Sequence, residues 1–212
     1  MVYDMGKNKR KRKISVHGTM EGEKSEKNLL EYLKEHYLDP TLTSFMENPK
    51  HGGTPNSLIL SALKYIDRDL VFVWLDEDKD LDEETLRAIA KCWNISPQLM
   101  DSFLLCALRD LQSTYNIQRR KPVLIVSQPV CVESLILKTL GYAPPCSRYE
   151  ADKRDEQIKQ LKSALGGVFK KNDHREFYRR VLNKQLLEER RKSIPELDLL
   201  ISMITAHQTA KN

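Results

Sequence analysis

The stretch LVFVWLDEDKD (70–80) decides the fold class of this chain. Its first six residues form an unbroken β-branched and aromatic run, which is typical of a strand buried on both faces of a parallel sheet. PVLIVS (122–127) is a second run of the same kind. Each run is followed by a helical pattern. Together they predict an α/β protein with a short parallel sheet flanked by helices.

The residues before this stretch predict one more strand and two helices. KISVHGTM (13–20) alternates apolar residues as a strand does. Residues 21–38 then place leucines at helical spacing. Residues 40–55 contain several Pro and Gly residues and are interpreted as a loop. A helix is predicted over 56–66, with Asn56 as its N-cap.

The rest of the chain is predicted to be helical. Helices are expected at 81–93 and 96–115, and at 128–141 after the third strand, with Gly141 as the C-terminal cap. The organisation follows as a basic tail (1–12), an α/β domain (13–145) and a helical C-terminal extension packed on it (146–212), with helices expected at 155–165, 174–192 and 196–204.

Composition excludes several classes of protein. The 212 residues carry a net charge of +5, and residues 7–13 alone contribute +6. No apolar run approaches the roughly 20 residues of a membrane span, and no apolar segment follows the basic N-terminus as in a secretory signal. The four cysteines form no metal-ligand pair or disulfide pattern, which favours reduced thiols in the cytoplasm. Phosphate-binding and dinucleotide glycine motifs are missing.

Acidic residues follow each of the three predicted strands. Glu21 follows the first strand, Asp76 and Asp78 follow the second, and Glu133 lies in the first turns of the helix after the third. Ligand sites of open parallel sheets lie outside the carboxyl ends of the strands. Asp76 and Asp78 are two residues apart on an extended segment, so they point to the same side and offer hard oxygen ligands to Mg²⁺. Glu21 would complete the site or accept a proton from an attacking water.

Ordinary structural roles remain open for several of these acids. Acidic residues at 82–84 suit the start of the next helix, and Glu77 is expected to face away from the site as a solvated loop residue. Glu133 is equally compatible with a helix N-terminal acid that only complements the helix dipole.

Three segments resemble motifs of the RloB-like Toprim proteins. EGEKSEKNLLEYL (21–33) resembles their opening acidic-Gly motif, VFVWLDEDKD (71–80) their DxD strand, and VSQPVCVESLIL (126–137) their Ser-x-Pro-x-x-x-Glu segment. The resemblance covers roughly residues 13–141. It departs from the family pattern at 17–19, where polar residues and glycine interrupt the first strand, and these departures put the substrate in doubt.

The resemblance implies an Mg²⁺-dependent endonuclease, with Mn²⁺ as an alternative ion. By position, Asp76 and Asp78 would be metal ligands, Glu21 a ligand or general base, and Glu133 a catalytic residue that positions a water or a second ion. Lys24 would contact a phosphate, although a solvated helix face explains it as well. Relatives of this type are effectors of prokaryotic antiviral defence and often work with a separate ATPase.

A second basic segment lies near the C-terminus. Residues 170–192 carry a local net charge of +5. Clustered Lys and Arg residues are what a nucleic-acid backbone requires, so Arg179 and Arg180 are interpreted as nucleic-acid-binding residues. An ordinary solvated amphipathic helix is the alternative.

The expected function is metal-dependent hydrolysis of nucleic-acid phosphodiester bonds, with RNA, including tRNA, slightly favoured over DNA. Two alternatives remain open: a non-catalytic Toprim-like adaptor that binds nucleic acid for a partner ATPase, and primase-like nucleotidyl transfer. The expected partners are nucleic acid, an ATPase and a further copy of the chain, with no membrane partner, and the expected location is cytoplasmic.

Overall fold

The computed structural model describes residues 12–22, 24–49, 54–78, 122–169 and 173–206, together with Arg87 and Lys91. Two predicted helices, at 81–93 and 96–115, lie outside the described residues. So does the basic tail up to residue 11. The elements in chain order are β1 (Ile14–Met20), α1 (Ser25–Tyr37), β2 (Thr43–Pro49), α2 (Pro55–Leu63), β3 (Leu70–Asp76), β4 (Pro122–Ser127), α6 (Val132–Leu140), η1 (Ala151–Lys153), α7 (Arg154–Phe169), α8 (His174–Val181), α9 (Lys184–Arg191) and α10 (Pro195–Ile204).

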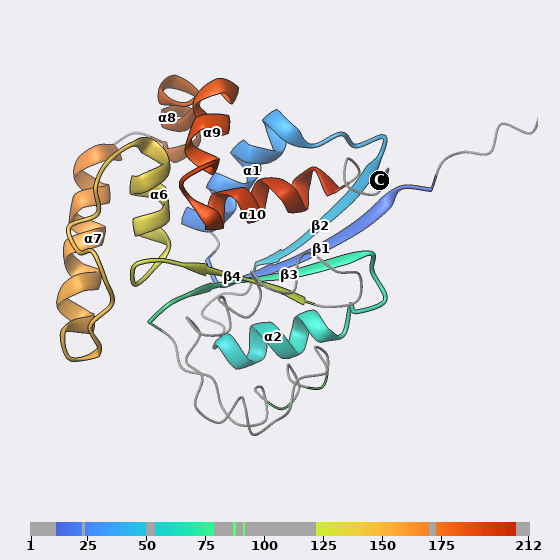
Figure 1. Cartoon of the computed structure of the whole chain (residues 1–212), viewed down its shortest axis with the longest axis horizontal. Helices are drawn as coiled ribbons and strands as arrows, with labels where there is room; N and C mark the ends of the chain where they lie inside the picture. Colours follow the sequence, from blue (N-terminus) through green and yellow to red (C-terminus); the bar gives the residue numbers. More distant parts are fainter. Residues whose placement is uncertain are drawn as a thin grey trace, which may run out of the picture.

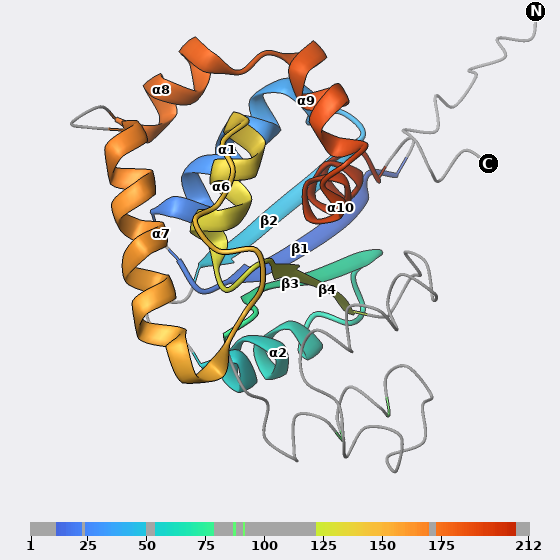
Figure 2. The same ribbon diagram turned by 60° about the vertical axis from the view of Figure 1, so that its left-hand side comes forward.

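The four described strands form one parallel sheet in the order β2-β1-β3-β4. Helices α1, α6 and α10 cover one face of this sheet, and α2 covers the other (Figures 1 and 2). The chain moves from β1 outward to β2 and then returns to the other side of β1 to form β3. The strand order therefore reverses between β1 and β3, the position at which open parallel sheets form ligand sites. The predicted α/β class is confirmed.

The hydrophobic core continues from the sheet into the C-terminal helices. Residues 70–75 of β3 are all buried. Trp74 is joined to β4 by a 2.7 Å hydrogen bond from its indole Nε1 to Ser127 Oγ. Helix α10 packs on β4, while α7, α8 and α9 contact α6, α1 and α10 respectively. The helical C-terminal extension is thus part of one packed body with the sheet. Within the described residues, no helix is long and apolar enough to cross a membrane.

Strand β2 lies where the sequence predicts a loop. It is an edge strand that pairs only with β1 in the described sheet. Only Thr43 of its seven residues is buried, and the others are half-buried or exposed. An edge strand with so little apolar surface lacks the alternation by which strands are identified, so the loop prediction was wrong for residues 43–49.

Two predicted helices have different boundaries. Helix α2 is capped by Thr54, whose Oγ1 accepts a 3.3 Å hydrogen bond from Ser57 N, and not by Asn56. The single helix expected over 174–192 is two helices, α8 and α9. Leu182 is extended and buried between them, and its carbonyl accepts a 2.8 Å hydrogen bond from Tyr32 Oη. Asn183 then caps α9.

His17 makes folding sensitive to pH. It is only 1% exposed, neither ring nitrogen has a hydrogen-bond partner, and its ring stacks on Tyr65 with centroids 3.8 Å apart. Burial, and then the charge of Arg68, lower the pKa of His17. A depressed histidine pKa means that the unfolded chain binds a proton which the folded chain does not. The free energy of unfolding should therefore fall as pH drops below about 6.5.

We expect His17→Phe, which keeps the stacked ring, to reduce this loss by about 1 kcal/mol between about pH 7.5 and pH 5.5. Urea unfolding at both pH values measures the effect. His174, whose pKa is also lowered by burial, contributes part of the remaining slope, and His174→Phe is the matched control. An identical pH dependence in His17→Phe and wild type would rule out this role.

Candidate active site at the carboxyl ends of the strands

Five carboxylates lie near one another at the carboxyl ends of β1 and β3. Four of them are predicted site residues: Glu21 directly after β1, Asp76 at the end of β3, Asp78 two residues on, and Glu133 in the first turn of α6. Glu21, Asp78 and Glu133 lie close enough to Asp76 for their negative charges to raise its pKa. The fifth is Glu26, in the first turn of α1. We call these five residues, Glu21, Glu26, Asp76, Asp78 and Glu133, the carboxylate cluster.

Asp76 carries the largest electrostatic strain of the cluster. Its Oδ1 accepts a 2.9 Å hydrogen bond from Val132 N, at the N-terminus of α6. The pKa of Asp76 is nonetheless raised well above its ordinary value, first by burial and then by the negative charges of Glu26, Asp78, Glu133 and Glu21. A bound cation would relieve this repulsion, which makes the position of Asp76 suitable for a metal ligand.

Glu26 is a member of the cluster that the sequence-based prediction missed. It is 6% exposed. Burial raises its pKa to about 7, and Glu133 and Glu21 add to the increase, whereas backbone hydrogen bonds from Glu26 itself and from Gly22 oppose it. A Cβ atom at Gly22 would lie 1.7 Å from Glu26 Oε2, so glycine is required for this approach. The signal in the sequence was Glu26 itself, an acidic residue in the first turn of the helix that follows Glu21 and Gly22.

Glu77 is not the solvated loop residue that the sequence suggested. Its two carboxylate oxygens accept hydrogen bonds from the loop between β4 and α6, from Gln128 Nε2 at 2.6 Å and from Val130 N at 3.0 Å. Asp78 N in turn donates to Val130 O at 3.1 Å. Val130 has a φ of 70°, which is strained for a β-branched residue. Glu77 therefore fixes the loop that presents the N-terminus of α6 to Asp76.

Asp78 is paired with a cation from the C-terminal extension. Arg154, the first residue of α7, places Nε 2.8 Å and Nη2 2.7 Å from Asp78 Oδ2. The Asp78 side chain is 3% exposed, and its Oδ1 is buried without a hydrogen-bond partner. Sequence reasoning missed Arg154, because nothing local links residues 76 positions apart.

The chemistry of the cluster fits a hard divalent cation. Its donors are carboxylate oxygens, which Mg²⁺ and Mn²⁺ prefer, and Asp78 Oδ1 is buried and unsatisfied. Within the described ranges, no three acidic, histidine or cysteine side chains already converge as metal ligands. Donors of the protein itself already hold one oxygen of Asp76, through Val132 N, and one oxygen of Asp78, through Arg154. A cation at this site would exchange with some of them.

The predicted nucleic-acid-binding residues lie at two different places. Lys24 is exposed at the start of α1, next to the carboxylate cluster. Arg179 pairs with Glu35 near the other end of α1, with Nη2 2.8 Å from Oε1. Ten residues of helix separate Ser25 from Glu35, or roughly 15 Å. Arg180 is exposed, with its guanidinium over the Phe177 ring. Arg179 and Arg180 therefore do not join Lys24 at the cluster.

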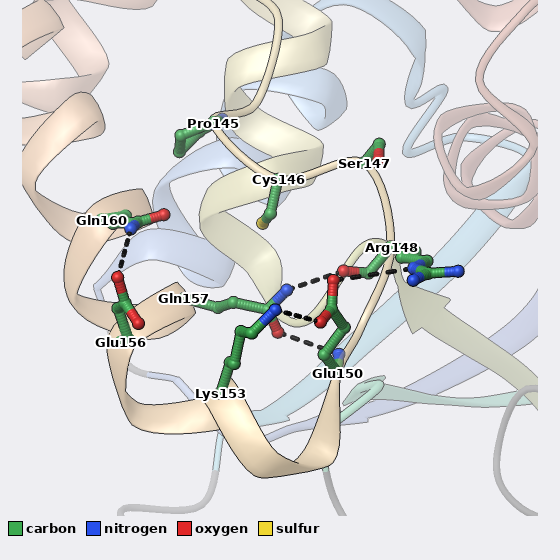
Figure 3. A pocket seen from close by; sticks show the side chains of 9 residues that line it. All are labelled: Pro145, Cys146, Ser147, Arg148, Glu150, Lys153, Glu156, Gln157 and Gln160. Carbon is green, nitrogen blue, oxygen red and sulfur yellow. Dashed lines mark hydrogen bonds and ion pairs between the residues drawn. The ribbon is translucent and has the colours of Figure 1, made fainter.

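A pocket of about 270 Å³ lies between α7 and the segment that precedes it. Figure 3 shows its polar side chains paired with one another. Lys153 Nζ lies 2.7 Å from Glu150 Oε2, and Gln157 Nε2 donates a 2.8 Å hydrogen bond to Arg148 O. Since these polar groups satisfy each other, the pocket offers a ligand much less than the carboxylate cluster does.

Comparisons with protein-family models, curated proteins and solved structures find no match to this chain.

Proposed function

We propose that this protein is a metal-dependent endonuclease of the RloB-like Toprim type that hydrolyses phosphodiester bonds of nucleic acid, with RNA favoured over DNA. The observation that carries the proposal is a group of neighbouring carboxylates where the strand order reverses between β1 and β3, in which Asp78 keeps a buried oxygen without a hydrogen-bond partner. Like charges so close together, with Glu26 and Asp78 buried, are costly to folding, and a divalent cation bound between them and a phosphate would offset their repulsion. A cytoplasmic location, a role in antiviral defence and a partner ATPase belong to the same proposal.

In this mechanism Asp76 and Asp78 hold the metal ion, with Glu21 as a third ligand or as the base. A bound Mg²⁺ would neutralise charge on the scissile phosphate and lower the pKa of the attacking water. Glu133, beside Asp76, orients that water. Glu26 has a pKa of about 7 and is therefore able to hold or release a proton near neutral pH. Lys24 contacts a phosphate of the strand beside the cluster.

Two alternatives use the same cluster differently. A non-catalytic adaptor would bind nucleic acid for a partner ATPase without cutting it. Primase-like nucleotidyl transfer would use the same acids, but the sequence contains no nucleotide-binding motif to support it.

Cleavage assays separate these functions. Purified protein is incubated with total tRNA, ribosomal RNA or plasmid DNA in the presence of Mg²⁺, Mn²⁺ or EDTA. We expect metal-dependent cleavage that EDTA abolishes and that Glu21→Gln lowers by about 100-fold or more. Cleavage that survives both Glu21→Gln and Asp76→Asn would refute this active site. No cleavage of any substrate would favour the adaptor.

Charge reversal on α8 tests the second basic segment. We expect Arg179→Glu combined with Arg180→Glu to weaken nucleic-acid binding and to reduce its salt dependence by about two counterions. Filter binding at several salt concentrations measures both effects. Glu35→Gln, which removes the partner of Arg179 without reversing a charge on α8, is the control for indirect effects. Binding that is unchanged in the double variant would exclude α8 from the interface.

A further inference from the structure

Arg154 reaches the carboxylate cluster from outside the predicted α/β domain. It begins α7, directly after η1, and its guanidinium makes a two-pronged contact with a single oxygen, Asp78 Oδ2. The Asp78 side chain is 3% exposed, whereas 39% of the Arg154 side chain remains exposed. The contact is therefore buried on the carboxylate side and open to solvent on the arginine side.

The guanidinium and a divalent cation compete for the same charge. A buried carboxylate needs a counter-ion, and Arg154 supplies one to Asp78 in this structure. A metal ligated by Asp78 would bring two positive charges close to the guanidinium, and like charges at such distances repel strongly. Arg154 is the first residue of α7 and its side chain is partly exposed. The side chain can therefore rotate into solvent while the helix stays packed.

We propose that Arg154 is a built-in counter-ion of Asp78 that the divalent metal displaces, so that Arg154 keeps the metal-free cluster folded and sets the metal concentration at which the site fills. This inference rests on the proposed metal site and adds its regulation. Arg154 acts through Asp78 and is a positioning residue.

Mn²⁺ titration of the full chain tests the proposal, with free Mn²⁺ followed by electron paramagnetic resonance. We expect Arg154→Gln to bind Mn²⁺ about tenfold more tightly than wild type, because a competing charge is gone. Lys153→Gln is the matched control, since it removes the same charge one residue away, where Lys153 pairs with the partly exposed Glu150. It should leave Mn²⁺ affinity unchanged.

Thermal unfolding gives a second measurement that does not depend on cleavage. In EDTA, Arg154→Gln should unfold at a lower temperature than wild type, because Asp78 is left buried and unpaired. Mn²⁺ should raise its unfolding temperature by more than it raises that of wild type. Arg154→Lys, which keeps the charge but loses one prong of the contact, should lie between the two and serves if Arg154→Gln folds poorly.

The outcomes separate this inference from the proposed function. If wild type binds Mn²⁺ and Arg154→Gln binds it equally or more weakly, the counter-ion role is wrong and the metal site stands. If neither protein binds Mn²⁺, the metal site itself is wrong, and the inference fails with it.

Discussion

Asp76→Asn is expected to abolish cleavage and, in the metal-free protein, to raise the free energy of unfolding. The activity should fall by about 10³-fold or more, because a lost metal ligand removes several kcal/mol of transition-state stabilisation. The hydrogen bond from Val132 N can persist, because the asparagine side chain keeps an oxygen in the place of Asp76 Oδ1. The loss of activity would therefore reflect charge and metal binding rather than a collapsed loop.

The stability gain follows from the raised pKa of Asp76. When the folded-state pKa of a carboxyl is above its unfolded value, the native chain retains a proton that the unfolded chain releases. Stability therefore declines as pH rises above about 4, the ordinary aspartate pKa. Asparagine removes this penalty, so the free energy of unfolding of Asp76→Asn at neutral pH should be higher than that of wild type.

Urea unfolding in EDTA across pH, together with the cleavage assay, checks both parts. Asp67→Asn is the matched control, because Asp67 is exposed and lies before β3, at the opposite end of that strand from Asp76. It should change neither quantity. A variant that is both inactive and less stable than wild type at neutral pH would contradict the account of Asp76 as an acid whose pKa is raised in the folded chain.

Gly18→Ala is expected to cause the largest loss of stability of any single methyl addition to the sheet. Gly18 lies opposite Phe72 in the register of β1 and β3. A Cβ atom at Gly18 would lie 2.2 Å from Phe72 Cζ and 2.4 Å from Cε1. The Phe72 ring is fully buried, so it cannot move without disturbing the core. We expect a loss of about 3 kcal/mol in the free energy of unfolding, at the upper end for an overpacked core.

A compensating change provides the check on this prediction. Phe72→Leu removes the ring that a Cβ atom at Gly18 would meet, so Gly18→Ala in that background should cost about 1 kcal/mol or less. Urea unfolding of both single variants and the double variant completes the cycle. Additive losses would mean that Gly18 is required for some reason other than the ring of Phe72.

The sequence predicts those parts of the fold whose pattern is local and strong. Residues 70–75 form the central strand β3 and residues 122–127 the strand β4 beside it, and the side chains at 70–75 and 123–127 are buried. Strand β2 was missed because it buries only Thr43, so its apolar pattern is weak. The break at Leu182 was missed because its cause, the hydrogen bond from Tyr32, comes from a distant helix.

The candidate site shows the same division. Glu21, Asp76, Asp78 and Glu133 could be predicted to meet, because parallel strands bring their carboxyl ends to one edge. Glu26 and Arg154 could not, since one depends on the close approach of Gly22 and the other on how α7 packs against the sheet domain. Glu77 holds the loop before α6, whereas Asp78 pairs with Arg154. These different roles can be seen only from the partners in the structure.

The claim that the carboxylate cluster binds a divalent metal is tested most directly by Mn²⁺ titration of wild type, Glu21→Gln and Asp76→Asn at neutral pH. The account predicts that wild type binds Mn²⁺ and that Asp76→Asn weakens this binding by about 100-fold or more. Glu21→Gln should weaken it as well if Glu21 is a ligand, and leave it nearly unchanged if Glu21 is the base. Mn²⁺ binding that is as tight in Asp76→Asn as in wild type, or missing from wild type, would contradict the account.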